Sequence, residues 1–468
     1  MSHHIAVIGA GPGGYAAAFY AADLGLQVTL IDNEKNPGGV CLYRGCIPSK
    51  ALLHVAKLLE ESKHAKDWGV DFGAAKVDLD KLRDYKNRVV EKLTSGTGQV
   101  SKLRKVNYIQ GWASIVDPKT IKVKKADGEE TVNVDYMILA LGSLPTKIPS
   151  LSIDSPRVLD STGALDLPEI PKSMLVIGGG YIGLELGSVY AALGTKVSVV
   201  EMTPGLLPGA DRDLVRFLAQ RVEKTFDKVM VSTRVTSMKA SDKNVTVNFE
   251  GEGAPKEATY DYVLVSIGRR PNARIDGLDK TRVKVDAKGF IETDGQRRTA
   301  EPTIFAIGDV AGEPMLAHKA SHEARVAVEA IEGQKAVFEP AAIPAVVFTD
   351  PEIAWAGLTE AEAEKQGLKV EVAKFPWPAS GRAIAIDRTD GMTKLIIDPE
   401  TERVLGVGIA GSGAGELIAE GVLAIEMGTT ASDLKLTIHA HPTLSETLME
   451  SAEVFFGQAT HVYKPKKK

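Results

Sequence analysis

Short apolar runs separated by glycine-rich turns and amphipathic stretches recur along the chain. The first segment, HIAVIGAGPGGYAAAFYAADLGLQVTLID, has an apolar run, a glycine-rich turn, an alanine-rich stretch of helical length and a second apolar run that ends at Asp32. A strand, a helix and a strand in this order predict a βαβ unit with parallel strands. The same order recurs in MLVIGGGYIGLELGSVYAALGTKVSVVE, which ends at Glu201. The chain is therefore predicted to contain two copies of one α/β unit.

Each copy carries a G-x-G-x-x-G signature and a later acid. These glycines permit a tight turn and a close approach of the backbone to a pyrophosphate at the helix N-terminus, and the acid can bind a ribose hydroxyl. One such turn is weak evidence, but in both copies 23 residues separate the first glycine from the acid, and this match predicts two dinucleotide sites. The residues are Gly9, Gly11, Gly14 and Asp32 in the first copy, and Gly178, Gly180, Gly183 and Glu201 in the second.

Glu201 and the residues after it indicate whether the second copy binds NAD or NADP. A carboxylate repels the 2′-phosphate of NADP, and Met202, Thr203 and Pro204 supply no arginine to bind one. The second copy is therefore predicted to bind NAD.

Three more apolar runs end in glycine. YMILALGSLP leads to Gly142 and YVLVSIGRRPN to Gly268, and each suits the last strand of a nucleotide-binding domain, where the chain leaves the sheet beside its ligand. In TIFAIGDVAGEPMLAHKASHEA a strand ends at Gly308, Asp309 follows, and a helix is expected around 317–330. Asp309 is placed either to meet a ligand or to cap a turn, and its position alone does not separate these interpretations.

Length and composition indicate a large globular chain. Its 468 residues suggest roughly three domains. The net charge of −5 offers no broad basic face, so no nucleic-acid partner is predicted. The start lacks the pattern of a secretory signal, and no uncharged run approaches the roughly 18 residues that span a bilayer, so we expect a cytoplasmic protein with no membrane partner.

Both cysteines lie in one short stretch, GGVCLYRGCIPSK. An extended chain would separate Cys41 and Cys46 by ~17 Å, so the chain must coil there if they are to form a disulfide. Pro48 suits the first turn of a following helix, which would place Cys46 at its positive end and Lys50 one turn further on. That field lowers the pKa of a thiol, so the pair is predicted to cycle between dithiol and disulfide. Two incidental thiols are the alternative, and zinc is disfavoured because there is no second cysteine pair.

In these motifs and their order, the chain resembles the pyridine nucleotide-disulfide oxidoreductase family along nearly its whole length. The resemblance rests on GAGPGG, GGVCLYRGCIPSK, ALGSLP, GGGYIGLELG, IGRRPN, IFAIGDVAGEPMLAHKA, VVFTDPEIAWAGLTE and HAHPTLSE. It implies an α/β fold class, with two Rossmann-like dinucleotide-binding domains plus an α+β C-terminal dimerisation domain. The implied boundaries are 1–146 for the FAD-binding domain, 147–273 for the NAD-binding domain, 274–343 for a central segment that completes the FAD domain, and 344–468 for the dimerisation domain.

The resemblance also implies roles for single residues, and no metal site. Cys46 matches the thiol that adjoins the flavin, and Cys41 the thiol that exchanges with substrate. Lys50 would pair with Glu185 near the flavin, whereas the plain alternative for Glu185 is an acid in the first turn of a helix. Asp309 would bind the ribityl chain of FAD. The implied cofactor-binding residues are Gly9, Gly11, Gly14, Asp32, Lys50, Gly142, Asp309, Ala317, Gly178, Gly180, Gly183, Glu185, Glu201 and Gly268. The sequence departs from the usual family pattern at Val40, Tyr43 and Leu141, on the flavin side of the pocket.

The C-terminal segment supplies a proton acceptor for the cysteine pair. In TIHAHPTLSET, His441 precedes Pro442, and Glu446 lies where its carboxylate could orient the ring. A histidine in a proline turn is more often structural, and neighbouring His439 is a candidate for that role. In the family, the histidine that matches His441 comes from the other subunit and reaches the disulfide. The resemblance thus implies that His441 and Glu446 are catalytic and that each active site requires a dimer.

The implied function is that of a homodimeric flavoenzyme that oxidises dihydrolipoyl groups and reduces NAD. Its substrate would be the lipoyl-bearing protein of a multienzyme complex, either a 2-oxo acid dehydrogenase or the glycine cleavage system, or small-molecule dihydrolipoamide. NADPH-dependent relatives would carry basic residues near Glu201, and others a second cysteine pair near the C-terminus, which this chain lacks. A non-catalytic protein that binds FAD and NAD is the alternative from another class, and the joint presence of Cys41, Cys46, His441 and Glu446 disfavours it.

Overall fold

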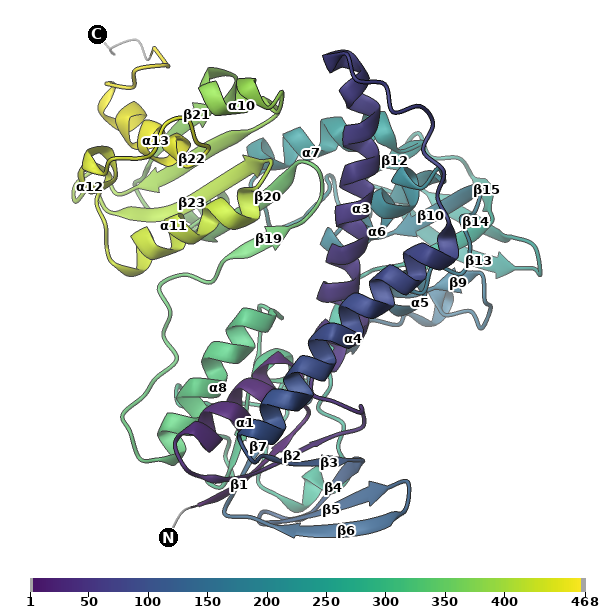
Figure 1. Ribbon diagram of the computed structural model, residues 1–468, viewed down its shortest axis with the longest axis vertical. Helices are drawn as coiled ribbons and strands as arrows, with labels where there is room; N and C mark the ends of the chain where they lie inside the picture. The colour runs from purple at the N-terminus through teal and green to yellow at the C-terminus, as the bar shows by residue number, and fades with distance from the viewer. Residues whose placement is uncertain (1–2, 464–468) are drawn as a thin grey trace.

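The computed structural model describes residues 3–463, which form three regions, each built on a five-stranded sheet (Figure 1). The first sheet is parallel and carries a helical layer on one face, where α1 and α8 pack together, and the small antiparallel sheet β4–β5–β6 on the other. Its strands, in spatial order, are β18 (Ile304–Ala306), β7 (Tyr136–Leu139), β1 (His4–Ile8), β2 (Gln27–Asp32) and β3 (Asn107–Gln110). The covering elements are α1 (Pro12–Asp23), α8 (Ala317–Ile331), β4 (Trp112–Asp117), β5 (Thr120–Lys125) and β6 (Gly128–Asn133).

The second region repeats this plan. Its parallel sheet also has a small antiparallel sheet on one face, and apolar side chains from both sheets share one buried cluster. The parallel strands are β12 (Lys228–Met230), β11 (Lys196–Val200), β10 (Ser173–Ile177), β16 (Tyr262–Val265) and β9 (Val158–Leu159). The antiparallel strands are β13 (Arg234–Ala240), β14 (Val245–Glu250) and β15 (Glu257–Tyr260), and the helices are α5 (Ser161–Leu165), α6 (Tyr181–Ala192) and α7 (Arg212–Thr225).

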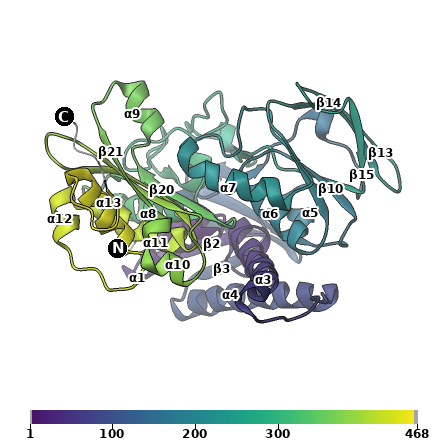
Figure 2. The ribbon, with the colours of Figure 1, turned by 90° about the horizontal axis from the view of Figure 1, so that it is seen from above.

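A helical pair and a short ribbon join these two regions. Helix α3 (Cys46–His64) follows α2 (Gly39–Arg44) and packs against both α4 (Leu79–Leu103) and α6, as the view from above in Figure 2 shows. Leu52 and Ala56 on its apolar face belong to the same buried cluster as residues of the second region. The ribbon pairs β8 (Ser143–Pro145) with β17 (Arg269–Pro271). The single-turn segments are η1 (Ala65–Trp68), η2 (Pro149–Leu151), η3 (Leu278–Lys280) and η4 (Gly308–Ala311).

The third region is an antiparallel sheet covered by helices. The chain reaches it through an extended segment after α8. Its strands, in spatial order, are β19 (Ala345–Val347), β20 (Glu352–Gly357), β23 (Val404–Gly411), β22 (Met392–Ile397) and β21 (Glu371–Pro376). The remaining elements are α9 (Glu360–Gln366), η5 (Trp377–Ala379), α10 (Gly381–Ala385), α11 (Ala414–Glu426), α12 (Ala431–Leu436) and α13 (Glu446–Phe456).

The predicted fold class is confirmed, with one correction in its detail. Both glycine-rich segments form the predicted βαβ units, and α8 covers the helix expected around 317–330. The run before Gly268 is β16, which is the last strand of the second sheet in chain order, as predicted. The run before Gly142 is β7, which is not the last strand of its sheet, because β18 joins that sheet later in the chain. The two strands also end three residues before those glycines. The domain boundaries remain predictions, and the return of β18 to the first sheet is the pairing that a central segment of the first domain would need.

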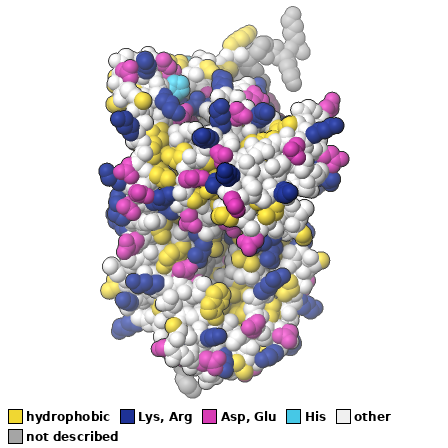
Figure 3. Space-filling model, turned by 90° about the vertical axis from the view of Figure 1, so that its right-hand side faces the viewer, with side chains coloured by type: hydrophobic (Ala, Val, Ile, Leu, Met, Phe, Trp, Pro, Cys, Tyr) yellow, Lys and Arg dark blue, Asp and Glu magenta, His cyan; other side chains and the backbone are white. Residues whose placement is uncertain are grey.

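The surface fits the charge pattern of the sequence. On the face drawn in Figure 3, basic and acidic side chains are interspersed rather than gathered by sign. Among the described residues, no helix is both long enough and apolar enough to cross a membrane.

The backbone contact inside the first glycine-rich turn yields a test. A Cβ on Gly14 would lie 1.8 Å from the carbonyl oxygen of Gly9, so Gly14→Ala should lower the free energy of unfolding by ~3 kcal/mol or more. Gly96 is the control, because it also lies inside a helix but a Cβ there meets no atom within 4 Å. Urea unfolding of both variants measures the difference. Equal stability of Gly14→Ala and Gly96→Ala would contradict this account of the turn.

Candidate active site

A cavity of about 660 Å³ lies where the first sheet, α2, α3 and α6 meet. Its volume is in the range of small-molecule and cofactor sites. The residues from the sequence analysis that line it are Gly9, Gly11, Asp32, Val40, Cys41, Cys46, Lys50, Leu141, Gly142, Glu185, Asp309 and Ala317. One cavity therefore brings together the first glycine-rich turn, both thiols and the expected flavin-side residues, although they come from distant parts of the chain.

The first glycine-rich turn is built by close backbone contacts. Gly9 has φ +97°, and a Cβ there would lie 2.3 Å from the carbonyl oxygen of Ala140, so only glycine fits. A Cβ on Gly11 would meet no atom within 4 Å, so at this cavity-lining residue the turn leaves open space at the N-terminus of α1. Such a cradle at a helix N-terminus suits the diphosphate of a dinucleotide, and these residues fit FAD.

Asp32 and Glu201 each accept hydrogen bonds from the backbone of their own glycine-rich turn. The sequence did not predict this contact with the backbone. Asp32 accepts hydrogen bonds from the N–H groups of Ala10 (2.6 Å) and Glu34 (2.9 Å). Glu201 accepts them from Gly179 (2.7 Å) and Thr203 (2.8 Å). Each acid therefore fixes the backbone of its own glycine-rich turn. The equal spacing of glycine and acid in the sequence was the signal for this shared geometry.

The second turn repeats the close contacts of the first. Gly178 has φ +108°, and a Cβ there would lie 2.5 Å from the carbonyl oxygen of Ser266. A Cβ on Gly183 would lie 2.3 Å from the carbonyl oxygen of Gly178, whereas one on Gly180 would meet nothing within 4 Å. Gly268, with φ +105°, lies after β16, the strand next to β10. These residues fit a second dinucleotide.

The two thiols lie next to each other. Cys41 is in α2 and Cys46 is the first residue of α3, and both are free thiols. The Cys41 thiol donates a hydrogen bond to Cys46, and this bond lowers the pKa of Cys46 from 9.0 to about 7; burial opposes the shift and the Lys50 charge assists it. The same hydrogen bond, together with burial, raises the pKa of Cys41. Cys46 is therefore the thiol that ionises first, as its place at the helix N-terminus predicted.

Lys50 and Glu185 form the pair that the resemblance implied. The Lys50 Nζ lies 2.8 Å from Glu185 Oε2, and the Glu185 side chain is only 4% exposed. The N–H of Phe348 donates to the other carboxylate oxygen (2.9 Å), and Lys50 Nζ lies 4.5 Å from the Phe348 ring centroid. Glu185 is the fifth residue of α6, beyond its first turn, so the plain helix-start alternative is wrong.

Asp309 belongs to a polar group that the sequence analysis missed. The hydroxyl of Ser143 donates to Asp309, and the Arg269 guanidinium donates to both the hydroxyl (2.8 Å) and the carbonyl oxygen (2.7 Å) of Ser143. Ser143 lies in ALGSLP and Arg269 in IGRRPN. The motifs therefore contained both residues, but nothing in them predicted that the two side chains meet. Asp309 faces the cavity and is tied to β8 and β17, which favours a ligand-binding role over a simple turn cap.

His441 and Glu446 are in contact, but they lie outside the cavity wall. His441 Nδ1 lies 2.9 Å from Glu446 Oε1, and the N–H of Thr443 donates to Oε2 (2.7 Å). Burial raises the pKa of Glu446, but these two partners outweigh it and the net shift is downward. The His441 side chain is 73% exposed. A single chain therefore does not bring His441 to the cysteines. His439 has the predicted structural role, with its buried ring 2.6 Å from Glu420.

Of the residues that depart from the family pattern, two line the cavity and one does not. Val40 and Leu141 are in its wall. Tyr43 instead directs its hydroxyl to the backbone of Asn36, donating to the carbonyl oxygen (3.1 Å) and accepting from the N–H (3.2 Å). The expected effect of Tyr43 on the flavin pocket is therefore at most indirect.

Comparisons with known proteins give one family. Residues 3–324 match the model of the pyridine nucleotide-disulphide oxidoreductases, and residues 343–452 match the dimerisation domain of the same family. The chain is 50% identical to a dihydrolipoyl dehydrogenase of Vibrio cholerae over 99% of this chain and 98% of that protein, and 45% identical to one of Geobacillus stearothermophilus over 97% of each. Among solved structures, LpdA of Mycobacterium tuberculosis superposes with a TM-score of 0.89 at 26% identity, covering 97% of this chain and 99% of that one. The flavoprotein disulfide reductase RclA of Escherichia coli superposes with a TM-score of 0.86, also at 26% identity, covering the same shares.

The low pKa of Cys46 can be measured by alkylation. Its thiolate is present above about pH 7 and is lost as the pH falls through that value. The rate at which iodoacetamide modifies Cys46 in the reduced protein should therefore rise with pH around a midpoint near 7. Cys41→Ala removes the hydrogen-bond donor and should move the midpoint toward 9.0, the ordinary value. Cys46→Ala should abolish the alkylation that titrates near pH 7 and so assigns it to Cys46. A wild-type midpoint near 9 would contradict the contact between the two thiols.

Proposed function

The chain belongs to the pyridine nucleotide-disulphide oxidoreductase family, and from this premise we propose that it has dihydrolipoyl dehydrogenase activity: it oxidises dihydrolipoyl groups to lipoyl disulfide and reduces NAD. The observation that carries the proposal is the pair of contacting thiols in the wall of the FAD cavity. Full-length relatives with 50% identity that bear the same activity in their names support it.

FAD and NAD are the cofactors. When bound, FAD would supply the two-electron chemistry that links the thiols to hydride transfer to NAD. The open turn at Gly11, the carboxylate of Asp32 and the polar group around Asp309 are the features that would hold FAD. The matching turn at Gly180 and the carboxylate of Glu201 would hold NAD.

The sulfur chemistry follows from the two unequal thiols. In the oxidised enzyme, a substrate thiolate attacks the Cys41 sulfur of the Cys41–Cys46 disulfide, and the Cys46 sulfur leaves as a thiolate. The low pKa of Cys46 makes it the better leaving group, and the ammonium of Lys50 stabilises its negative charge. The second substrate sulfur then attacks the substrate sulfur of the mixed disulfide. Cyclic lipoyl disulfide leaves, and Cys41 is released as a thiol after it takes up a proton.

His441 is proposed as the proton acceptor. With Nδ1–H directed at Glu446, its Nε2 is free to take the proton from a substrate thiol and later to return it to Cys41. Glu446 is held ionised by Thr443 and by the ring, so it fixes this tautomer and stabilises the imidazolium. Because one chain leaves His441 exposed and outside the cavity wall, the acceptor for each cysteine pair would be His441 of the partner subunit.

The C-terminal region supports a homodimer. It matches the family's dimerisation domain. Large apolar side chains between the start of α11 and His441 are exposed in the single chain: Leu423, Met427, Leu436 and Ile438, the last 96% exposed. Exposed apolar side chains at this density indicate a surface that is covered in the assembled protein. A twofold pairing would use the same face of both chains and would bring each His441 to the other chain.

The substrate arm is proposed to arrive on another protein. No lipoyl-bearing segment is evident in the sequence, so the dihydrolipoyl group would be carried by the lipoyl-bearing protein of a 2-oxo acid dehydrogenase or glycine cleavage complex. The proposed location of the reaction is the cytoplasm. Dihydrolipoamide serves as the small-molecule substrate in assays.

The activity is tested by comparing substrate pairs. The purified flavoprotein should form NADH from dihydrolipoamide and NAD, and should use NADP at least about 100-fold less well, because Glu201 would face the added phosphate. It should not reduce glutathione disulfide with NADPH. Turnover with NADPH and glutathione disulfide, but none with dihydrolipoamide, would refute the proposed function.

The proton acceptor has its own test. His441→Gln should lower kcat for NADH formation by about 10²–10⁴-fold, the usual contribution of a general base. Glu446→Gln should lower it less, because the ring is still present. His461→Gln is the control, since His461 pairs with a different glutamate of α13, Glu450, and acts on Glu446 only through its charge. If His441→Gln and His461→Gln had the same small effect, His441 would not be the acceptor.

A further inference from the structure

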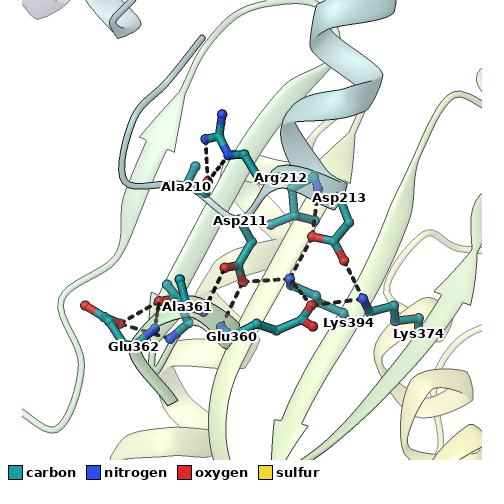
Figure 4. Close-up of polar contacts among 11 residues, drawn as sticks. Ala210, Asp211, Arg212, Asp213, Glu360, Ala361, Glu362, Lys374 and Lys394 are labelled. Atoms are coloured by element: carbon teal, nitrogen blue, oxygen red, sulfur yellow. Dashed lines mark hydrogen bonds and ion pairs between the residues drawn. The ribbon is translucent and has the colours of Figure 1, made fainter. Parts of the chain in front are cut away.

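A buried lysine ties the C-terminal region to the second region of the fold. Lys394 lies in β22 with its side chain 1% exposed, and its Nζ lies 2.6 Å from Asp211, 2.8 Å from Asp213 and 2.6 Å from Glu360 (Figure 4). A buried ammonium is costly unless it is fully paired. The three carboxylates have oxygens within 4.8 Å of one another, the arrangement of a cation site, and here the cation is the lysine itself.

The partners come from both sides of a domain interface. Asp211 and Asp213 flank the first residue of α7 in the second region, whereas Lys394 and Glu360 belong to the C-terminal region. Lys374 adds two contacts, 2.7 Å to Asp213 and 2.9 Å to Glu360. Burial raises the pKa of Asp213, but the two lysines outweigh it and lower that pKa to about 2. Asp213 therefore stays ionised at all physiological pH values.

Asp211 connects this network to the second glycine-rich turn. It immediately precedes Arg212, whose guanidinium donates to the carbonyl oxygens of Leu206 (2.7 Å) and Ala210 (3.1 Å). The N–H of Leu207, in the same loop, donates to the carbonyl oxygen of Gly179 (2.9 Å). Gly179 lies in the turn between β10 and α6 and is also held by Glu201.

The chain of contacts thus runs from Lys394 through Asp211, Arg212 and the 206–210 loop to Gly179. The link from Lys394 to Asp211 is an ion pair that crosses the domain interface, and Asp211 and Arg212 are neighbours in the chain. The remaining links are hydrogen bonds to backbone carbonyl oxygens. The first glycine-rich turn has matching supports, since Asp32 accepts from the N–H of Ala10 (2.6 Å) and the N–H of Gly38 donates to the carbonyl oxygen of Ala10 (2.7 Å).

We propose that Lys394 is a positioning residue for NAD: from the C-terminal region it fixes the 206–210 loop and so the backbone of the turn that faces the NAD diphosphate. The proposal rests on the proposed function, because it assigns NAD to this turn. Lys394 is not among the residues that line the cavity of the candidate active site, and it would act through Asp211 and Arg212.

The experiment separates the NAD step from the dithiol step. In Lys394→Met holoenzyme, the KM for NAD should rise about tenfold while kcat changes less than threefold. Reduction of the bound FAD by dihydrolipoamide without NAD should proceed at the wild-type rate, because the contacts do not reach the first region. A merely structural role would instead lower both steps together with the melting temperature.

Two further variants guard against a folding defect. Arg212→Gln cuts the path without removing the ion network and should raise the KM for NAD to a similar extent. Lys374→Met is the matched control, because Lys374 contacts Asp213 and Glu360 but not Asp211; its KM for NAD should stay within twofold of wild type.

The outcomes are distinguishable from those of the activity test. If wild-type protein failed to form NADH from dihydrolipoamide, the proposed function itself would fail. If wild type is active but Lys394→Met and Arg212→Gln keep the wild-type KM for NAD, the positioning role is wrong. An equal rise in Lys374→Met would also overturn it, since the effect would then belong to the network as a whole.

Discussion

The hydrogen bond between the thiols of Cys41 and Cys46 is the contact on which the chemistry of this protein depends. In a continuous helix, residues five apart point about 140° away from each other, so the two sulfurs would diverge. The chain avoids this by ending α2 at Arg44 and starting α3 at Cys46, with Gly45 between them. A Cβ on Gly45 would lie 2.9 Å from the carbonyl oxygen of Val40, so the break itself requires glycine. The result is one thiol with a raised pKa and one with a lowered pKa, which is the inequality that a directional disulfide exchange needs.

The charge beside that thiol pair is held by all three regions of the fold. Lys50 lies one turn after Cys46 on α3, its partner Glu185 lies on α6, and Phe348 follows β19. Because Glu185 is almost fully buried, its carboxylate needs both the ammonium and the N–H of Phe348. The electrostatic setting of Cys46 thus depends on the packing of α3 against the second region and on the start of the C-terminal region. A change in the arrangement of the three regions would therefore also change the chemistry of the Cys46 thiol.

The sequence predicted well what is local and poorly what joins distant segments. The glycine turns, the βαβ units and the helix after Cys46 follow from residues a few positions apart, whose geometry is set by φ, helix periodicity and strand patterning. The contact of Ser143 with Asp309 joins residues 166 positions apart, and that of Lys394 with Asp213 joins residues 181 apart. No periodicity encodes such contacts. Lys50 with Glu185, 135 positions apart, was found only because the family resemblance supplied the pairing.

Lys394 illustrates why buried polar groups are informative about function. Replacing a buried ion pair by apolar side chains of similar volume is often neutral or stabilising, so stability alone gives little reason for a lysine and three carboxylates at this interface. An apolar contact does not fix the relative orientation of two surfaces, because it tolerates small sliding and rotation. Hydrogen-bonded charges do fix that orientation. The start of α7 and the loop before it are the parts so fixed, and they carry the backbone that holds the second glycine-rich turn. On the proposed role of Lys394, an orientation requirement at the second glycine-rich turn, and not a stability requirement, accounts for the charges at this interface.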